Sequence, residues 1–395
     1  NKHRKNRSMK ELSEIESKIY EKNSDKKGAM LLMLWGEQGS MKTMSMTRMV
    51  MIDMGVDNVG DKFDKEKIRR IPLWKAQQSC QWILLAANDL PITFWMHESV
   101  QDYTFKLTGS RRSGLDSRKI DPERMNGLDI EFKTFEEPEE IVEDIEPDRV
   151  NAYFIPGSSG TESDKYFYQK KTLELCQALN ERDYGDHVSL NWDEVQNEAP
   201  DKTNGDFYEL QMSSFPTEWE DFRKNRVTLR GTGHSHNEVN WKLHKNKVTG
   251  TVYLKKAQVH GRHTEVSQSA VNDMNPGEFV VDGYQPGNFN MPQLPAKNFD
   301  WMPDHADVKL KMEVEYSLPD VRPTNMDVEK WIDGQPFTQD HLDDIVDADE
   351  ASEIIEITSR VVKRKFQKGE VPAIKLNGKW FTSMSALVNE EDVPS

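Results

Sequence analysis

Short apolar runs, each about the length of one strand, recur along the chain. Residues 29–35 (Ala-Met-Leu-Leu-Met-Leu-Trp) contain no polar side chain, which is typical of a parallel strand that is covered on both faces. Shorter runs of the same kind predict further strands at residues 92–96, 150–155, 188–192 and 227–230.

Helices are predicted between these strands. Residues 42–54 carry apolar side chains around most of the helix circumference, which indicates a buried helix, and Gly55 supplies a residue that ends it. Helical stretches are also expected near residues 74–87 and over 165–181, and the acidic segment 135–148 is expected to form a short surface helix. Strands that alternate with helices favour an α/β fold with a parallel sheet.

The chain of 395 residues is long enough for an α/β core with a further module, so we expect two domains. Proline, glycine and asparagine are dense in residues 275–295, and prolines recur through residues 300–335, which indicates a linker. The expected organisation is an exposed, charged helix or tail at residues 1–27, the core at 28–295, a linker at 296–345 and a compact module at 346–391.

A glycine-rich segment, Gly36-Glu-Gln-Gly-Ser-Met-Lys-Thr43, connects the first expected strand to the first expected helix. Such a turn surrounds a phosphate chain with backbone N–H groups and with the positive end of the helix. Lys42 would then reach the β- and γ-phosphates of ATP, and the Thr43 hydroxyl would bind Mg²⁺. Met41 stands where glycine is usual, and a turn that binds nothing is the alternative interpretation. The expected nucleotide-binding residues are Gly36, Glu37, Gln38, Gly39, Ser40, Met41, Lys42, Thr43 and Met44.

Two carboxylates, Asp193 and Glu194, follow the apolar run at residues 188–192. At the carboxyl end of a buried strand, one acid can hold Mg²⁺ while the next activates water. We therefore expect Asp193 to bind the metal, directly or through water, and Glu194 to polarise the attacking water. A pair of solvated charges is the alternative interpretation, but the phosphate loop upstream favours the catalytic one.

Taken in order, the phosphate loop, the Trp192-Asp-Glu194 strand and the Gly233-His-Ser235 strand resemble the additional-strand, catalytic-glutamate branch of P-loop ATPases. The resemblance covers about residues 28–260 and points to the FtsK/HerA group and the related zonula-occludens-toxin-like and archaeal viral or plasmid ATPases. Residues 195–200 likewise resemble the segment after the acidic pair in DNA-pumping ATPases. The implied fold is α/β, with a RecA-like P-loop core and a parallel sheet. Such cores usually form a hexameric ring that moves double-stranded DNA.

The same resemblance assigns roles to residues around the Gly233-His-Ser235 strand. His234 or Ser235 would sense the γ-phosphate, although a histidine that only stabilises its loop is an equally good interpretation. Ring ATPases often receive a positive charge near the γ-phosphate from a neighbouring subunit. Arg226 is the preferred candidate, and Arg223 and Arg262 are the alternatives, although a surface salt bridge is the commoner role for each.

Composition constrains the partners and the compartment. A formal net charge of −16 argues against a protein that coats nucleic acid through its overall charge. Lysines and aromatic residues are concentrated at residues 239–256, where they would face DNA phosphates or guard the edge of a hairpin.

Cys80 and Cys176 form no metal or disulfide pattern, and no apolar run approaches the roughly 20 residues that span a bilayer. We therefore expect a cytoplasmic protein, in the host cytoplasm if it is viral.

The last 50 residues have their own pattern: helices are expected at 347–355 and 358–367, followed by a hairpin that turns at Asn377-Gly378. This segment resembles an excisionase or MerR-type winged helix-turn-helix module, although residues 355–357 (Ile-Glu-Ile) stand where Leu-Gly-Val is usual. The resemblance implies that the second helix enters the major groove and that the wing touches the backbone. A winged helix that binds protein is the alternative. The expected DNA-binding residues are Arg360, Lys363, Arg364, Lys365 and Lys379.

The leading hypothesis is an ATP-hydrolysing motor that uses Mg²⁺ to translocate or package double-stranded DNA, in genome packaging, conjugation or segregation. We expect a hexameric ring, with a portal, membrane or capsid protein as its anchor. A RepA- or DnaB-like helicase on single-stranded DNA is the first alternative. A DNA-bound switch, in which ATP binding rather than turnover matters, is the second; Met41 favours it and Glu194 argues against it.

Overall fold

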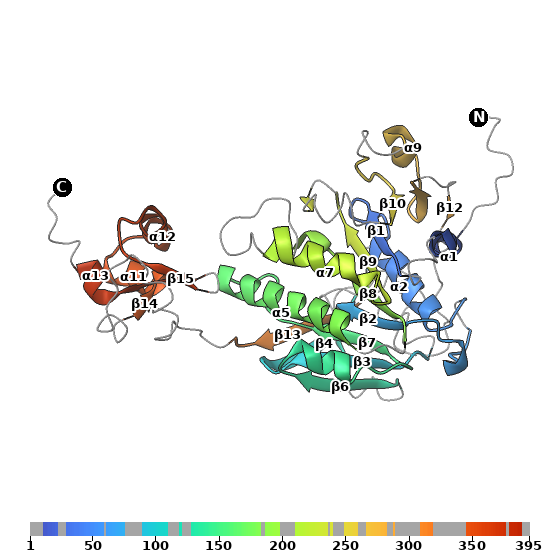
Figure 1. The fold of residues 1–395 in the computed structure, drawn as a ribbon, viewed down its shortest axis with the longest axis horizontal. Helices are drawn as coiled ribbons and strands as arrows, with labels where there is room; N and C mark the ends of the chain where they lie inside the picture. Colours follow the sequence, from blue (N-terminus) through green and yellow to red (C-terminus); the bar gives the residue numbers. More distant parts are fainter. Residues whose placement is uncertain are drawn as a thin grey trace. The chain divides into compact units, whose positions relative to one another are not determined.

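The computed structural model divides into two compact units, one of residues 1–156 and 169–317 and the other of residues 157–168 and 318–395 (Figure 1). The structure describes residues 11–22, 29–58, 61–75, 89–109, 118–120, 128–182, 186–197, 210–235, 238–239, 249–259, 266–282, 287–288, 309–318, 345–376 and 379–388. None of the helices in these ranges is long and apolar enough to cross a membrane.

A large, mostly parallel sheet forms the centre of the first unit. Its strand order is β12-β11-β10-β1-β9-β8-β2-β7-β3-β6, and every pair from β10 to β6 is parallel, whereas β11 is antiparallel to both of its neighbours. The strands are β1 (Leu31–Trp35), β2 (Ile71–Lys75), β3 (Ile92–His97), β6 (Ile130–Phe135), β7 (Val150–Phe154), β8 (Val188–Trp192), β9 (Val227–Gly233), β10 (Gly250–Leu254), β11 (Glu278–Val281) and β12 (Gly287–Asn288).

Helices and a second sheet complete this unit. The helices are α1 (Leu12–Lys22), α2 (Lys42–Asp53), α4 (Pro138–Glu143), α5 (Glu162–Glu181), which crosses the boundary between the units, α7 (Phe215–Phe222) and α9 (Gln268–Asn272), with single turns at Lys65–Lys67, Val195–Asn197 (η4) and Leu210–Ser214. Strands β4 (Val100–Thr108), β5 (Arg118–Ile120) and β13 (Lys309–Tyr316) form a three-stranded antiparallel sheet.

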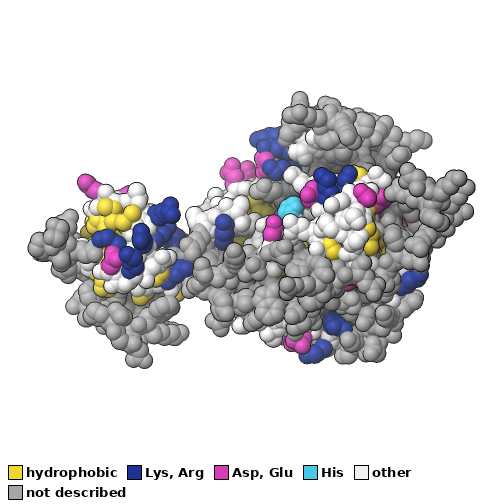
Figure 2. All heavy atoms as spheres, turned by 90° about the horizontal axis from the view of Figure 1, so that it is seen from above, with side chains coloured by type: hydrophobic (Ala, Val, Ile, Leu, Met, Phe, Trp, Pro, Cys, Tyr) yellow, Lys and Arg dark blue, Asp and Glu magenta, His cyan; other side chains and the backbone are white. Residues whose placement is uncertain are grey.

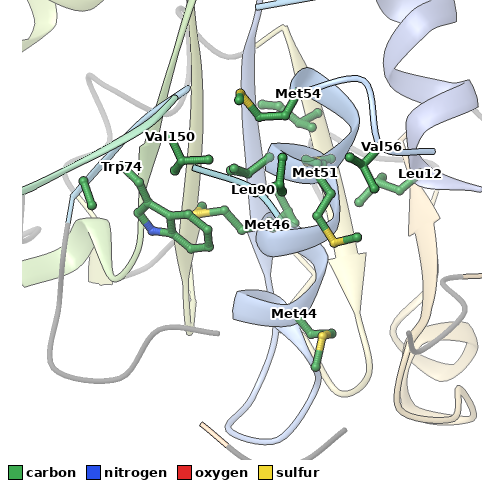
Figure 3. Close-up of a cluster of buried hydrophobic side chains, with 14 of the residues drawn as sticks. Leu12, Met44, Met46, Met51, Met54, Val56, Trp74, Leu90 and Val150 are labelled. Atoms are coloured by element: carbon green, nitrogen blue, oxygen red, sulfur yellow. The ribbon is translucent and has the colours of Figure 1, made fainter. Parts of the chain in front are cut away.

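The buried strand and the buried helix that the apolar pattern of the sequence predicted are confirmed. All five residues of β1 are buried, and α2 packs against the sheet through methionines such as Met46, Met51 and Met54 (Figure 3). Unbranched methionine side chains adapt to irregular space, which suits a helix that is covered on most sides. The helix ends as expected at Gly55, whose φ of 78° allows Val56 N–H to donate to the Met51 carbonyl at 2.9 Å.

The five strands predicted from apolar runs are confirmed, as are the short acidic helix (α4) and the helix over 165–181 (α5). The helix expected near 74–87 is wrong at its start, because Trp74 and Lys75 end β2, between β7 and β8; residues 76–88 lie outside the described part. Pro72 lies inside β2, and proline argues against a central strand, which is why the pattern was missed.

Two segments that were expected to be peripheral contribute to the core. In α1, Leu12, Ile15 and Glu16 are each at most 5% exposed, so this helix is not the exposed tail that its charge suggested. Within the expected linker, residues 309–316 form β13, which pairs with β4. Leu310, Met312 and Val314 alternate with charged residues there, as they do in a half-buried strand, and Met312 is buried.

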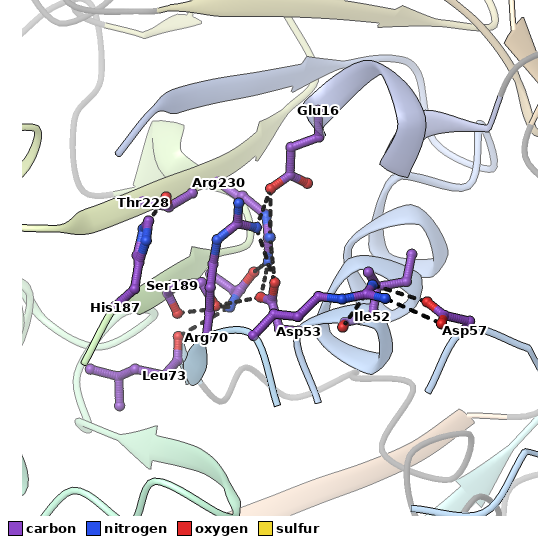
Figure 4. Close-up of polar contacts among 12 residues, drawn as sticks. Glu16, Ile52, Asp53, Asp57, Arg70, Leu73, His187, Ser189, Thr228 and Arg230 are labelled. Carbon is purple, nitrogen blue, oxygen red and sulfur yellow. Dashed lines mark hydrogen bonds and ion pairs between the residues drawn. The ribbon is translucent and has the colours of Figure 1, made fainter. Parts of the chain in front are cut away.

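A buried charge network joins α1, α2 and β9 (Figure 4). Arg230, 1% exposed in the middle of β9, donates to Glu16 of α1 at 2.8 Å and to both oxygens of Asp53, the last residue of α2. Arg70 donates to the same two acids at 2.6 and 3.1 Å. Burial alone would raise the pKa of Asp53, but the charges of Arg230 and Arg70 outweigh it and lower that pKa. The network therefore brings two acids and two arginines together beside the sheet.

The described part of residues 318–395, in the second unit, contains three helices and a small antiparallel sheet. Its elements are β14 (Ile345–Asp347), α11 (Ala348–Ile354), α12 (Ser359–Lys368), β15 (Ile374–Leu376), β16 (Lys379–Ser383) and α13 (Met384–Val388), and β16 pairs with both β14 and β15. Leu376 pairs with Lys379, as the predicted hairpin requires, although Asn377 and Gly378 themselves lie outside the described residues. Residues 355–357, which stand where Leu-Gly-Val is usual, lie in the turn between α11 and α12. Glu356 has a φ of 51°, so a glutamate adopts there the left-handed conformation that glycine favours.

Candidate nucleotide site

The phosphate loop lies between β1 and α2, at the carboxyl edge of the parallel sheet. Gly36 N–H donates to the Gly233 carbonyl of β9 at 3.2 Å, which fixes the start of the loop against the neighbouring strand. Gly39 and Met41 have φ values of 80° and 75°, and Met41 is the N-cap of α2. Met41 thus adopts the left-handed conformation that glycine would adopt more cheaply, at a cost of roughly 1–2 kcal/mol.

The loop is shaped for close approach by a polar group. A Cβ atom at Gly36 would lie 2.3 Å from Ser40 Oγ and 3.0 Å from Ser40 Cβ, so a side chain there would displace Ser40. Ser40 is 2% exposed, and its Oγ has no hydrogen-bond partner among the described residues. A buried hydroxyl without a partner is costly, and a phosphate oxygen would satisfy it. These features fit a phosphate chain.

Lys42 is 7% exposed, and its Nζ points back into the loop. It donates to the Gly36 carbonyl at 2.5 Å and to the Glu37 carbonyl at 3.3 Å, and it lies 3.2 Å from Nδ1 of His234. Burial lowers the pKa of Lys42, although the charges of Glu194 and Asp193 oppose this shift. A phosphate would therefore stabilise an ammonium group that burial destabilises.

Asp193 connects the phosphate loop with the two neighbouring strands. Its Oδ2 accepts a hydrogen bond from Thr43 Oγ1 at 3.0 Å, and its Oδ1 accepts one from the Thr232 hydroxyl on β9. A buried carboxylate beside a threonine hydroxyl provides the oxygen ligands that Mg²⁺ prefers. The residues present therefore fit a magnesium ion, which would neutralise charge on the β- and γ-phosphates.

Glu194 is the next residue and is more accessible. Its φ of 61° turns the chain away from β8, and its N–H donates to Thr232 Oγ1 at 3.1 Å. Its side chain, 32% exposed, lies between two groups: Oε2 accepts from Gln196 Nε2 at 2.7 Å, and Oε1 is 3.5 Å from His234 Nε2. A carboxylate that is held by polar neighbours but remains open to solvent is suited to activate water.

His234, rather than Ser235, belongs to this cluster. The imidazole lies between Lys42 and Glu194, whereas the Ser235 hydroxyl donates to Gln258 at 2.9 Å. Sequence reasoning missed Thr232 and Gln196. Both stand two residues from a predicted site residue; the adjacency of β8 and β9 brings Thr232 to Asp193, and the turn η4 brings Gln196 to Glu194.

Other residues expected at the site lie elsewhere in this chain. The side chain of Met44 is buried in the hydrophobic core, so Met44 could contact a nucleotide only through its backbone. Arg226 precedes β9, at the end opposite to His234, and its carbonyl accepts from Val188 N–H at 3.2 Å. Arg223 is the C-cap of α7, and Arg262 lies outside the described residues.

The order of the central strands defines the class of the fold. Strand β9 lies between β1, which leads into the phosphate loop, and β8, which ends in Asp193. An added strand between these two is what the sequence resemblance implied. The first unit is an α/β, RecA-like P-loop core.

Neither a protein-family model nor a curated protein sequence matches the chain. Among solved structures, the genome packaging NTPase B204 from Sulfolobus turreted icosahedral virus 2, in complex with ATPγS, is 10% identical to the chain and has a TM-score of 0.33. That match covers 67% of this chain and 98% of B204. The N-terminal domain of zonular occludens toxin from Neisseria meningitidis is 13% identical, covers 74% and 95% of the two chains, and has a TM-score of 0.26.

A third match is the pCW3 conjugation coupling protein TcpA, which is 10% identical, with a TM-score of 0.30, and covers 69% of this chain and 62% of TcpA. Likenesses this distant carry no argument about function. The functional proposal therefore rests on the geometry of the site.

The second unit has a basic surface on α12. Arg360, Lys363, Arg364 and Gln367 recur at helical spacing and, with Ser359, line a hollow of about 710 Å³. Figure 2 shows Lys and Arg side chains gathered on this unit. Lys363 lies 3.5 Å from Asp349, and Lys379 on β16 lies 3.9 Å from Asp347. Lys365, the fifth residue expected to bind DNA, is not among those that line the hollow.

Proposed function

We propose that this protein is an ATP-hydrolysing motor that translocates or packages double-stranded DNA. The observation that carries the proposal is the convergence of Lys42 and Thr43 from the phosphate loop with Asp193, Glu194 and His234 from two neighbouring strands. A cation, a metal-binding pair, a general base and a sensor are the parts that phosphoryl transfer to water requires.

In the proposed reaction, the Lys42 ammonium group leaves the Gly36 carbonyl and forms an ion pair with the γ-phosphate. Asp193 and Thr43 would hold Mg²⁺, which would supply positive charge to the phosphates. Glu194 accepts a proton from the attacking water, and His234 contacts the γ-phosphate while its other nitrogen faces Glu194. Strands and helices hold these residues in the positions from which they would act, so the site needs little reorganisation during the reaction.

A positive charge from a neighbouring subunit completes the proposal. Arg226 lies at the opposite end of β9 from His234, so it can reach a nucleotide only in another copy of the chain. We propose that the copies form a hexameric ring. A portal, membrane or capsid protein would anchor such a ring, in the cytoplasm of the cell or of a viral host.

The second unit would bind the DNA. On α12, Arg360, Lys363 and Arg364 face the same hollow, and such a row can enter the major groove or contact phosphates. Lys365 lies on the same helix, and Lys379 on β16 would contact the DNA backbone. In an acidic chain, a local basic face is the feature that can attract nucleic acid.

Steady-state ATP hydrolysis, measured alone and with double- or single-stranded DNA, tests the motor. We expect double-stranded DNA to stimulate turnover by the wild type, whereas Glu194→Gln should bind ATP and lose turnover by at least about 100-fold. Glu139→Gln, an exposed glutamate on α4, is the matched control and should behave as the wild type. Stimulation by single strands alone would instead support a helicase, and turnover that no DNA changes would contradict the motor.

A further inference from the structure

Gln196 contacts the carboxylate of Glu194 directly. It lies in the single helical turn η4, which follows Glu194 and is closed by the hydrogen bond from Asn197 N–H to the Glu194 carbonyl at 3.0 Å. From this turn the Gln196 amide reaches back, and its Nε2 donates to Glu194 Oε2 at 2.7 Å. The loop that carries the base therefore also carries a donor for it.

The opposite side of the Gln196 amide is confined by β9. A Cβ atom at Gly233 would lie 3.0 Å from Gln196 Oε1 and 2.5 Å from the Trp35 ring, so the absence of a side chain at Gly233 makes room for the amide. Gln196 Oε1 is buried and has no hydrogen-bond partner among the described residues. A buried oxygen without a partner is unfavourable, and turning the amide over would instead place this oxygen against the Glu194 carboxylate.

We propose that Gln196 is a positioning residue for the general base. It holds one oxygen of Glu194, so that the other, Oε1, stays beside His234, where the attacking water must be placed. This inference rests on the proposed hydrolysis, and it adds a residue that the phosphate-loop and acidic motifs do not contain. Glu194 is 32% exposed and otherwise has room to turn into solvent, so its orientation depends on this contact.

Gln196→Met tests the contact, because methionine keeps the length of the side chain and removes the donor. We expect kcat for ATP to fall by roughly 10- to 100-fold, the range that misplacement of a reacting group produces. The dissociation constant of a non-hydrolysable ATP analogue should stay within about twofold of the wild-type value, since Gln196 contacts no loop residue that holds phosphate. Gln268→Met on α9 is the matched control and should leave both quantities unchanged.

A double-mutant cycle separates positioning from a general structural role. In the Glu194→Gln background, measured under single-turnover conditions, Gln196→Met should change the rate by less than about twofold, because the group it positions is gone. A full additional loss in that background would show that Gln196 does not act through Glu194, and unchanged kcat in the single variant would equally overturn the inference.

Two further results keep the outcomes distinct. If Gln196→Met fails to bind the analogue, Gln196→Glu is the variant that tests the inference. It keeps the size and polarity of the side chain but replaces the donor by an acceptor, and we expect the same loss of kcat. A wild type that hydrolyses no ATP would overturn the proposed function, and this inference with it. An active wild type with fully active Gln196 variants would overturn this inference alone.

Discussion

The Nζ atom of Lys42 lies 3.2 Å from Nδ1 of His234, so this contact joins the helix end of the phosphate loop to the residue that follows β9. Nε2 of the same imidazole lies 3.5 Å from Glu194. His234 therefore connects the cation expected at the γ-phosphate with the carboxylate expected to activate water. A phosphate that attracted Lys42 would alter the contact between Lys42 and the imidazole. The contact between the imidazole and Glu194 would then change as well.

Replacing His234 should separate catalysis from binding. We expect His234→Ala to lower kcat by about 10- to 100-fold, because the sensor and one neighbour of the base are lost. Lys42→Ala should instead abolish detectable nucleotide binding. Phosphate release and titration with a fluorescent ATP analogue measure the two effects, and equal kcat for His234→Ala and the wild type would contradict the assigned role.

Thr232 should be needed for the metal, because its hydroxyl donates to Asp193 and accepts from the Glu194 N–H. We expect Thr232→Val, which keeps the shape, to raise the Mg²⁺ concentration required for half-maximal ATP hydrolysis. Thr228→Val is the matched control on the same strand; its hydroxyl contacts His187 at 2.8 Å, far from the loop. A Mg²⁺ dependence that shifts equally in both variants would contradict a specific role for Thr232.

Arg230 should matter for stability. Arg230→Met leaves Asp53 and Glu16 buried with Arg70 as the remaining cation of the network, and breaking such a group costs about 3–5 kcal/mol of unfolding free energy. Arg69→Met is the control, since its ion pair with Asp57 is half exposed and should be worth at most about 1 kcal/mol. Urea unfolding measures both, and similar midpoints for the two variants would show that the network is unimportant.

Stability should depend on pH through His187. Burial, helped by the charge of Arg70, lowers the pKa of His187 from 6.5 to about 3. Between these values the unfolded chain binds a proton that the folded chain does not, so the unfolding free energy falls as the pH falls, by up to about 1.4 kcal/mol per pH unit. Urea unfolding between pH 4 and pH 7 should show a shallower decline for His187→Gln. Identical slopes would contradict the buried, neutral histidine.

The α12 surface should bind DNA electrostatically. We expect Arg364→Ala to weaken binding and to reduce the slope of log affinity against log salt by about one. Lys67→Ala removes an exposed lysine from the first unit, 66% exposed, and should leave the slope unchanged. Fluorescence anisotropy with a labelled duplex measures both. An unchanged slope in Arg364→Ala would favour a protein partner for this surface.

Local patterns were sufficient for the centre of the fold and for the loop. The unbroken apolar run of β1, the glycine-rich turn and the helix that starts at Lys42 are adjacent in sequence, so their arrangement could be predicted. The position of Glu194 was predictable too, because a buried strand ends immediately before the acidic pair, whereas its role stays a prediction.

What sequence reasoning missed depends on contacts between distant segments. Strand β2 contains Pro72, and β13 lies in a proline-rich stretch, so local signals argued against both strands. One face of the charged helix α1 is buried, where Glu16 contacts Arg230, more than 200 residues away. Thr232 contacts Asp193 only because β8 and β9 are neighbours.

The central claim is that Glu194 activates water at a site that binds ATP through Lys42. Phosphate release by Glu194→Gln, compared with the wild type at saturating ATP and Mg²⁺, tests it most directly, with nucleotide binding measured on the same samples. The account predicts that the variant binds ATP as tightly as the wild type and loses turnover by at least about 100-fold. Turnover within a few-fold of the wild type, with binding intact, would contradict it.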